Sequence, residues 1–403
     1  MKNSGEKRKE IDRDESCSEE PACKAVRLSA EVDPEPPKLE NIELNSELDS
    51  QKPSNANELA AIPETTDEDI VSNSLPNHVI EWSKAHYQQI CRTFNIHSEI
   101  SKTNIDTVMS EFSRVIPNEK YTEYINSLQE SFAPLNFSPV KQSDSEADNS
   151  SSSILSEDVL KDVIKNLRSS KDKLSSNQFS RFPSAFSFLN DLNILSKVTM
   201  SNVGTAHLKM IFHSLLQSVG LQVRSGCDYT AQEEIFDSKY MAEPDMRIYA
   251  ENHTEYKEPK IMATVKVGHS SSHSDQEEES LPSMDLISQA VGELLLDFRH
   301  AQYTHELFAF VVEGTKVWLV RLRRQTSNDT DADRCRMMVD REYRWKNFMT
   351  SEKEISVSQP MDYLFKEDRD NLYQVLAKFA SLAGYATDSI SSSSSSRQRL
   401  YNK

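Results

Sequence analysis

The chain lacks the features that mark several common classes of protein. No apolar run reaches the roughly 18 residues that a membrane-spanning helix needs, and the opening MKNSGEKRKEIDRDESCSEE has no apolar core like that of a secretory signal peptide. We therefore expect no association with a membrane. The five cysteines are scattered and odd in number. They predict neither a disulfide framework nor a zinc knuckle, and they fit a reducing compartment.

Short motifs of several enzyme classes are also missing. The chain has only 8 glycines in 403 residues and contains neither GxGxxG nor GxxxxGKS/T, so the usual phosphate-binding loops are absent. It contains no GxSxG elbow, no HExxH pair and no kinase signature. Any enzymatic activity must therefore rest on a different set of residues.

Positive charge is scarce relative to negative charge. The formal net charge is −18, from 46 Lys and Arg against 64 Asp and Glu, and residues 1–70 hold 9 and 19 of these. No region is basic enough for tight non-specific binding to nucleic acid through phosphate neutralisation. We therefore expect protein partners, with DNA or RNA possible at a local basic groove. The sequence leaves the oligomeric state open.

Residues 1–75 predict a disordered acidic tail, because Glu, Asp, Ser, Pro and Asn dominate and aromatic residues are nearly absent. Two basic clusters lie within it, one at Lys7 to Lys9 and one at Lys24 and Arg27. Their spacing is typical of a bipartite nuclear-import signal. A charged tail with chance clustering explains them equally well, so nuclear and cytoplasmic locations both remain open.

A largely helical part follows the tail. Apolar residues recur every three to four positions over 76–136, which predicts a helical region. Residues 137–153 are polar and predict a linker, and 154–199 predict a helical lead-in whose first helix starts at Ser156. At the other end of the chain, residues 386–403 contain six consecutive serines and predict a disordered tail.

Residues 200–385 predict an α/β domain, with a mixed central sheet flanked by helices. Apolar density and periodicity give the order helix, strand, loop, strand, strand, helix, strand, strand, followed by a closing helix. The expected elements are a helix at 203–219, strands at 221–223, 246–249 and 261–267, a helix at 284–301, strands at 307–312 and 316–322, and a helix within 357–385.

Two charged residues lie at related positions on neighbouring expected strands. Pro244 and Asp245 come at the start of the strand MRIY, and Lys266 lies in IMATVKV, 21 residues after Asp245. Metal-dependent phosphodiester cleavage needs carboxylates that hold Mg²⁺ and a cation that offsets charge on the phosphate. Over roughly 200–325 the chain resembles a degenerate member of the PD-(D/E)XK phosphodiesterase superfamily, which implies a restriction-endonuclease-like fold.

The pattern of this superfamily requires an acid two positions before the lysine, and Thr264 stands there. In some members of the superfamily the missing acid lies on the next helix instead, and Glu293 is the candidate for that position here. Gln289 lies four positions before Glu293, and therefore on the same helix face. An acidic residue nearer the first helix, Glu233 or Glu234, is a further candidate. The implied catalytic residues are Asp245, Lys266, Glu293 and Gln289. The implied metal ligands are Asp245, Glu293 and Glu233.

Other polar clusters carry weaker predictions. Arg321, Arg323 and Arg324 end the last strand and predict a phosphate-binding groove, although Asp329, Asp331 and Asp333 nearby would pair with them equally well. His269 and His273 lie in a Ser-rich loop with Asp275 and Glu277, which preorganises nothing for a metal. Trp318 and Trp345 are expected in or near the core.

Three hypotheses follow from these residues. The leading one is a catalytically inactive nuclease-like domain, probed by whether a second carboxylate lies within metal reach of Asp245. The second is an active Mg²⁺-dependent nuclease with the acid at Glu293, which requires Asp245, Glu293 and Lys266 to converge. The third is a protein-interaction adaptor unrelated to nucleases, built on the helical region and the acidic tail. No cofactor is expected unless the site is active, in which case it is Mg²⁺.

Overall fold

The computed structural model describes residues 74–112, 115–136, 155–171, 182–198, 202–225, 230–250, 260–269, 281–326 and 329–384. The acidic tail up to residue 73, the predicted linker and the Ser-rich tail lie outside the described residues, with the basic clusters at Lys7–Lys9 and Lys24–Arg27. His273, Asp275 and Glu277 lie outside them as well. No helix within the described residues is both long and apolar enough to cross a membrane.

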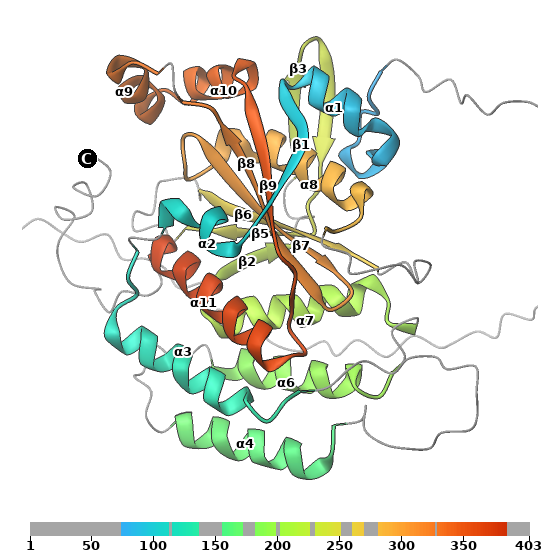
Figure 1. Cartoon of the computed structure of the whole chain (residues 1–403), viewed down its shortest axis with the longest axis vertical. Coiled ribbons are helices and arrows are strands. Elements are labelled where there is room, and N and C mark those ends of the chain that lie inside the picture. Colours follow the sequence, from blue (N-terminus) through green and yellow to red (C-terminus); the bar gives the residue numbers. More distant parts are fainter. Residues whose placement is uncertain are drawn as a thin grey trace, which may run out of the picture. The chain divides into compact units, whose positions relative to one another are not determined.

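A mixed sheet forms the centre of the described part of the chain (Figure 1). Its strand order is β1-β9-β8-β7-β6-β5-β2, and β10 pairs with β8. The strands are β1 (Ile96–Thr103), β2 (Gln222–Ser225), β5 (Met246–Tyr249), β6 (Ile261–Gly268), β7 (Glu306–Glu313), β8 (Lys316–Arg324), β9 (Lys353–Ser358) and β10 (Met361–Asp362). This sheet confirms the predicted α/β class.

Strand directions follow from the connections. β5 lies between β2 and β6 and is antiparallel to both. The helix α8 (Met284–Asp297) then crosses over, so that β7 runs parallel to β6. β7 and β8 form a hairpin with Gly314 in the left-handed region at its turn. The element order predicted over 203–322 is therefore observed, with an added hairpin between β2 and β5.

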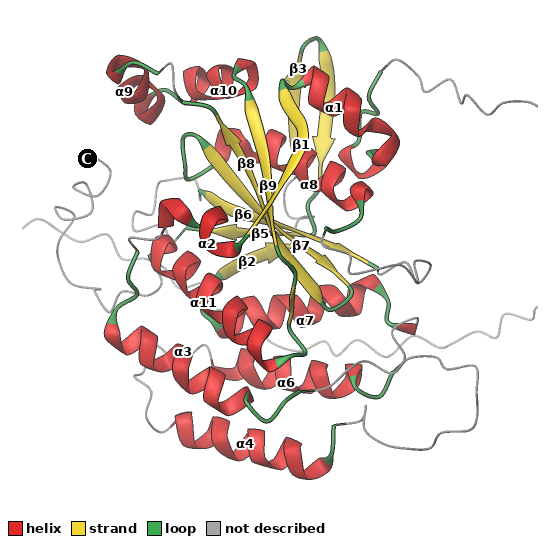
Figure 2. Cartoon of the chain, viewed as in Figure 1, coloured by secondary structure: helices red, strands yellow, loops and turns green. Residues whose placement is uncertain are grey.

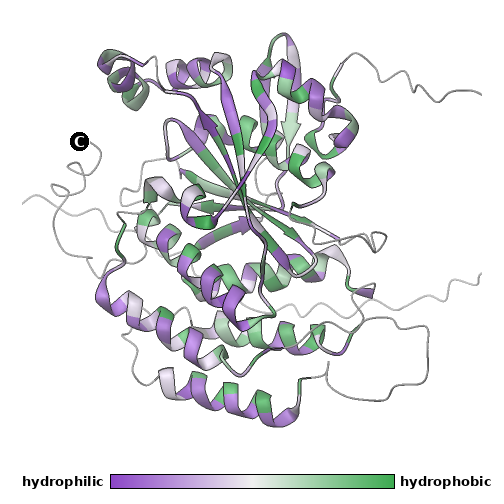
Figure 3. Cartoon of the chain, in the orientation of Figure 1, coloured by the Kyte–Doolittle hydropathy of each residue, from purple (hydrophilic) through white to green (hydrophobic). Residues whose placement is uncertain are grey.

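Helices cover one face of the sheet in two layers (Figure 2). Their apolar sides join the inward residues of β5 to β8 in one core. Figure 3 shows apolar colour on the central strands and mixed colours on the helices around them. The helices of this face are α2 (Ile105–Val108), α3 (Glu119–Phe132), α4 (Glu157–Lys171), α6 (Phe182–Leu195), α7 (Thr205–Ser218) and α11 (Lys366–Ala383).

The opposite face has a second core built around α8. Other elements of this face are α1 (Tyr87–Thr93), α10 (Arg341–Thr350) and the hairpin of β3 (Ala231–Ile235) with β4 (Ser238–Ala242). Helix α9 (Asp331–Val339) precedes α10. Trp318 and Trp345 are both buried in this core, as predicted.

The segment before residue 200 packs onto the sheet rather than standing apart, a point that the sequence left open. Tyr121 and Tyr124 of α3 donate their hydroxyl protons to the carbonyls of Val219 and Ser218, just after α7. The predicted start of the helix at Ser156 is also observed, since its hydroxyl accepts from the amide of Val159.

Two expectations about elements were wrong. Residues 96–103, placed in the helical region, form the edge strand β1, which pairs with β9 and is mostly exposed. An edge strand that buries few side chains leaves no apolar alternation to read. The expected loop after β2 contains most of β3, whereas the closing helix α11 lies within 357–385 as expected.

Candidate functional site

A polar layer lies between strands β5 and β6 and helix α8. Side chains alternate along β6, so that Val265 and Val267 enter the core on the α7 side while Thr264 and Lys266 face the other way. Arg247 of β5 lies opposite Thr264 in the register. Charged side chains therefore line the side of the sheet that α8 covers.

Asp245 lies just before the start of β5, where the layer meets solvent, and its side chain is 10% exposed. One carboxylate oxygen, Oδ2, accepts from the backbone amide of Val267 at 2.6 Å. The other, Oδ1, lies 2.5 Å from the ammonium of Lys209 on α7. The backbone contact fixes the carboxylate against the same stretch of β6 that carries Lys266.

Lys266 and Glu293 form a buried ion pair behind Asp245. The Lys266 ammonium donates to Oε1 of Glu293 at 3.0 Å, and the two residues are 4% and 1% exposed. Burial disfavours the charge of Lys266, but the carboxylates of Glu293 and Asp245 outweigh it and hold its pKa above the ordinary value. Asp245 bonds to the amide of Val267, the residue after Lys266, and Lys266 bonds to Glu293, so the three groups belong to the same end of β5 and β6.

A second buried pair lies further along the layer. The Arg247 guanidinium donates to both oxygens of Asp297, at 2.7 and 3.0 Å, and neither side chain is exposed. Asp297 follows Glu293 by four residues, so one face of α8 supplies both carboxylates. The layer thus has three carboxylates and three cations, and Lys209 is the only half-exposed member.

Glu293 is the least satisfied group in the layer. Its Oε2 is buried without a hydrogen-bond partner, as is the hydroxyl of Thr264. Burial, with the nearby charge of Asp245, raises the pKa of Glu293 to about 7, although Lys266 opposes this. A buried carboxylate oxygen without a donor is a position where a cation would be stabilised.

Asp245 and Glu293 fit a divalent cation such as Mg²⁺, which needs only part of its ligands from the protein. Mg²⁺ is commonly held by one or two carboxylates together with water and substrate phosphates. Oε2 of Glu293 lacks a partner, and Asp245 is partnered at Oδ1 by a lysine that has solvent around it. Within the described ranges, no group of three or more Asp, Glu, His or Cys side chains is arranged so that it could hold a metal ion. A cation held by protein ligands alone is therefore not supported there.

Gln289 and Glu233 do not join this group. The Gln289 amide donates to the backbone carbonyls of Ile80 and Trp82, so it fastens the N-terminal segment onto α8. Glu233 on β3 pairs with Arg299 at 3.1 Å. Glu234 beside it is exposed. The predicted catalytic role of Gln289 and metal role of Glu233 therefore have no support in these contacts.

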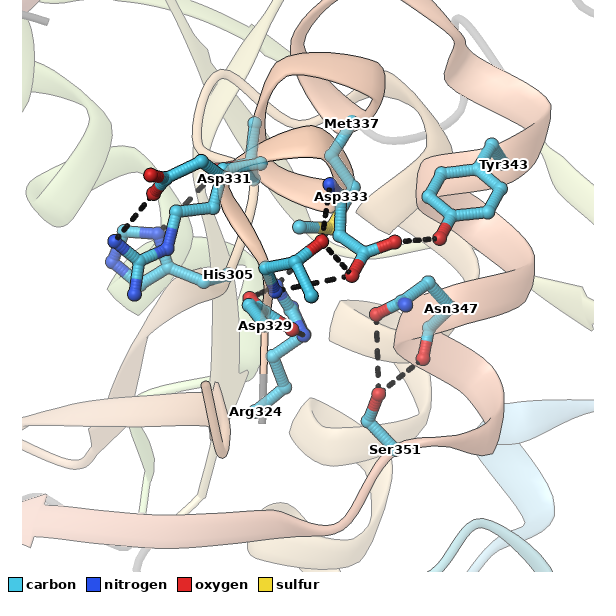
Figure 4. A network of polar contacts seen from close by, with 12 residues as sticks. His305, Arg324, Asp329, Asp331, Asp333, Met337, Tyr343, Asn347 and Ser351 are labelled. Atoms are coloured by element: carbon cyan, nitrogen blue, oxygen red, sulfur yellow. Dashed lines mark hydrogen bonds and ion pairs between the residues drawn. The ribbon is translucent and has the colours of Figure 1, made fainter. Parts of the chain in front are cut away.

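Two of the three arginines predicted to form a phosphate-binding groove, Arg321 and Arg324, are bonded within the protein instead. Arg321 is buried and donates to the carbonyls of Thr107 and Val108 at the end of α2. Arg324 is also buried and pairs with Asp329 beside Met337 (Figure 4). Arg323 is half-buried. The pairing of this cluster with nearby Asp, considered as the alternative, is thus observed for Arg324.

The sequence analysis missed three members of the layer, namely Lys209, Arg247 and Asp297. Asp297 had a usable signal, since it repeats the four-residue spacing of Gln289 and Glu293. Arg247 lies two positions after Asp245, on the same side of the strand. Lys209 had no signal, because only the packing of α7 brings it to Asp245.

Comparisons with known proteins add no further constraint. No protein-family model, curated protein or solved structure matches the chain. The functional argument therefore rests on the polar layer itself.

Proposed function

We propose that the chain is a divalent-cation-dependent phosphodiesterase of the nuclease type, with its second acid at Glu293. The observation that carries this proposal is that Asp245 bonds to the amide of Val267, next to Lys266, while Lys266 pairs with Glu293 at the same end of β5 and β6. The active-nuclease hypothesis requires the head groups of all three residues to meet at one cation or phosphate position. The observed order of helix, antiparallel strands, helix and parallel strand also supports the resemblance to the PD-(D/E)XK superfamily.

Each residue has a separate role in this proposal. Asp245 and Glu293 hold the cation, and Val267 keeps Asp245 oriented through its backbone amide. Lys266 offsets negative charge that builds up on the phosphate. When bound, Mg²⁺ supplies positive charge next to the phosphate and favours ionisation of a water molecule. Thr264, at the usual acid position, contributes no charge.

A cleavage assay tests the proposal. Full-length protein is incubated with single-stranded DNA, duplex DNA and RNA, with Mg²⁺ or Mn²⁺ or with a chelator. Cation-dependent cleavage is expected for the wild type, with loss of at least about 100-fold in rate for Asp245→Asn, since the metal and its charge stabilisation are lost together. Lys161→Met is the matched control, because Lys161 pairs with Glu157 on the exposed surface of α4.

A second candidate is the inactive nuclease-like binding module. The observation that favours it is the near-complete burial of the Lys266–Glu293 pair, in which the lysine and the acid satisfy each other instead of a substrate. Absence of cleavage and of Mn²⁺ binding in the wild type would favour this candidate over the enzyme. The nuclear location and the protein partners stay predictions under either candidate.

A further inference from the structure

Lys209 differs from the other cations of the layer in its exposure. Lys266 and Arg247 are buried, whereas the Lys209 side chain is 41% exposed. It belongs to α7, on the opposite side of the sheet from α8, and reaches Asp245 at the sheet end. A long side chain with this much solvent contact can leave its partner at little cost.

The charges of the layer show what Lys209 does there. Asp245, Glu293 and Asp297 supply three negative charges, and Lys266 and Arg247 supply two positive charges. Lys209 balances the third carboxylate. When all three carboxylates are ionised, the layer without Lys209 carries one uncompensated negative charge, and Oε2 of Glu293 has no hydrogen-bond partner, a combination that attracts a cation.

From this arrangement we propose that Lys209 is a displaceable counter-cation, which occupies Asp245 in the metal-free protein and leaves when a divalent cation binds. This inference rests on the proposed function, because it concerns the same cation site. Lys209 is thus an internal competitor for the metal, and it sets the cation concentration at which the site fills. It also prevents Asp245 from being left unpaired when the site is empty.

Substitution of Lys209 separates this role from a purely structural one. Lys209→Met removes the charge and keeps much of the apolar stem. Mn²⁺ affinity measured by calorimetry is expected to rise roughly five-fold, since a partly exposed ion pair no longer competes. Lys209→Arg keeps the charge and is expected to bind Mn²⁺ like the wild type. Lys161→Met serves again as the control away from the sheet.

Thermal unfolding supplies the second readout. In a metal-free buffer, Lys209→Met is expected to unfold at a lower temperature than the wild type, and added Mn²⁺ to raise that temperature more than in the wild type. A lysine that only braced α7 against the sheet would lower the unfolding temperature without this added response to Mn²⁺.

The outcomes are distinct from those for the proposed function. Mn²⁺ binding by the wild type with equal or weaker binding by Lys209→Met overturns the counter-cation role and leaves the cation site standing. Binding by Lys209→Met alone supports the role of an internal competitor. Absence of binding in both variants overturns the counter-cation and the cation site together.

Discussion

Buried cations occur on both faces of the sheet, and their partners differ. Under α8, Lys266 and Arg247 pair with carboxylates. On the other face, Arg369 of α11 is equally buried but donates to backbone carbonyls, including those of Phe132 and Leu135. A cation that donates to backbone carbonyls satisfies the free carbonyls at a helix end or in a loop, as Arg369 does after α3. Cations paired with carboxylates gather ionisable groups of both signs in one place, and a site for a cation and a phosphate needs such groups.

Other buried cations can be classified in the same way, by whether they bond to carbonyls or to carboxylates. Arg321 resembles Arg369, because it donates to the carbonyls at the end of α2. Lys353 donates to the carbonyls of Phe94, Met349 and Ser351 near the end of α10. These cations hold the structure together, and the candidate site is confined to the layer of carboxylate pairs.

The largest expected effect comes from breaking a carboxylate pair. Arg247→Met leaves Asp297 buried without its counter-ion, and we expect a loss of about 3–5 kcal/mol in the free energy of unfolding. Lys266→Met is expected to cost less, because Glu293, with its pKa near 7, can take up a proton. Urea denaturation at pH 7 measures both. Equal losses in the two variants would contradict this expected difference between the two pairs.

Removal of Arg369 tests the carbonyl-bound type of cation. Arg369→Met leaves several buried carbonyls without a donor, so we expect a loss of about 3 kcal/mol. The fraction that remains folded should bind Mn²⁺ with wild-type affinity. Calorimetry below the unfolding transition measures this affinity. A change in affinity would mean that the two faces are coupled.

The contact between α8 and the N-terminal segment can be broken without touching charge. A Cβ atom at Gly292 would lie 2.6 Å from Val79 and 2.7 Å from Trp82, both buried. Gly292→Ala is therefore expected to cost about 1–3 kcal/mol through overpacking. Gly204→Ala is the control, since nothing lies within 4 Å of its Cβ position. Similar denaturation midpoints for the two variants would contradict this packing.

The smallest expected effect is a pH dependence of the free energy of unfolding that comes from Lys353. Burial lowers the pKa of Lys353 to about 7. Above that pH the folded state holds the neutral amine while the unfolded chain still binds a proton, so stability rises with pH. The free energy of unfolding of wild type minus that of Lys353→Met should increase by roughly 1 kcal/mol from pH 7 to pH 8. A flat or falling difference would contradict a depressed pKa.

The sequence predicted the elements whose side chains are buried. α7, β6, α8 and the β7–β8 hairpin have strong apolar patterns, and all were found where expected. β1 was missed because an exposed edge strand buries few side chains. The hairpin of β3 and β4 was missed because its short strands alternate between exposed and buried positions over only five residues each.

The site was predictable in part for a related reason. Asp245, Lys266 and Glu293 were assigned from the resemblance to the PD-(D/E)XK superfamily, which rests on their places in the expected strands and helix. Lys209, by contrast, depends on how α7 crosses the sheet end, which no local pattern encodes. Gln289 was assigned by its helix face, yet the same face also meets the segment around Trp82.

The most direct test of the central claim is a double-mutant cycle for Mn²⁺ binding by full-length protein. Wild type, Asp245→Asn, Glu293→Gln and the double variant are compared by calorimetry, with thermal unfolding to check that each is folded. If the two carboxylates hold one cation, each single variant loses at least about tenfold in affinity, and the double variant loses less than the two losses combined. Wild-type affinity in Glu293→Gln, or no binding by the wild type, would contradict the claim.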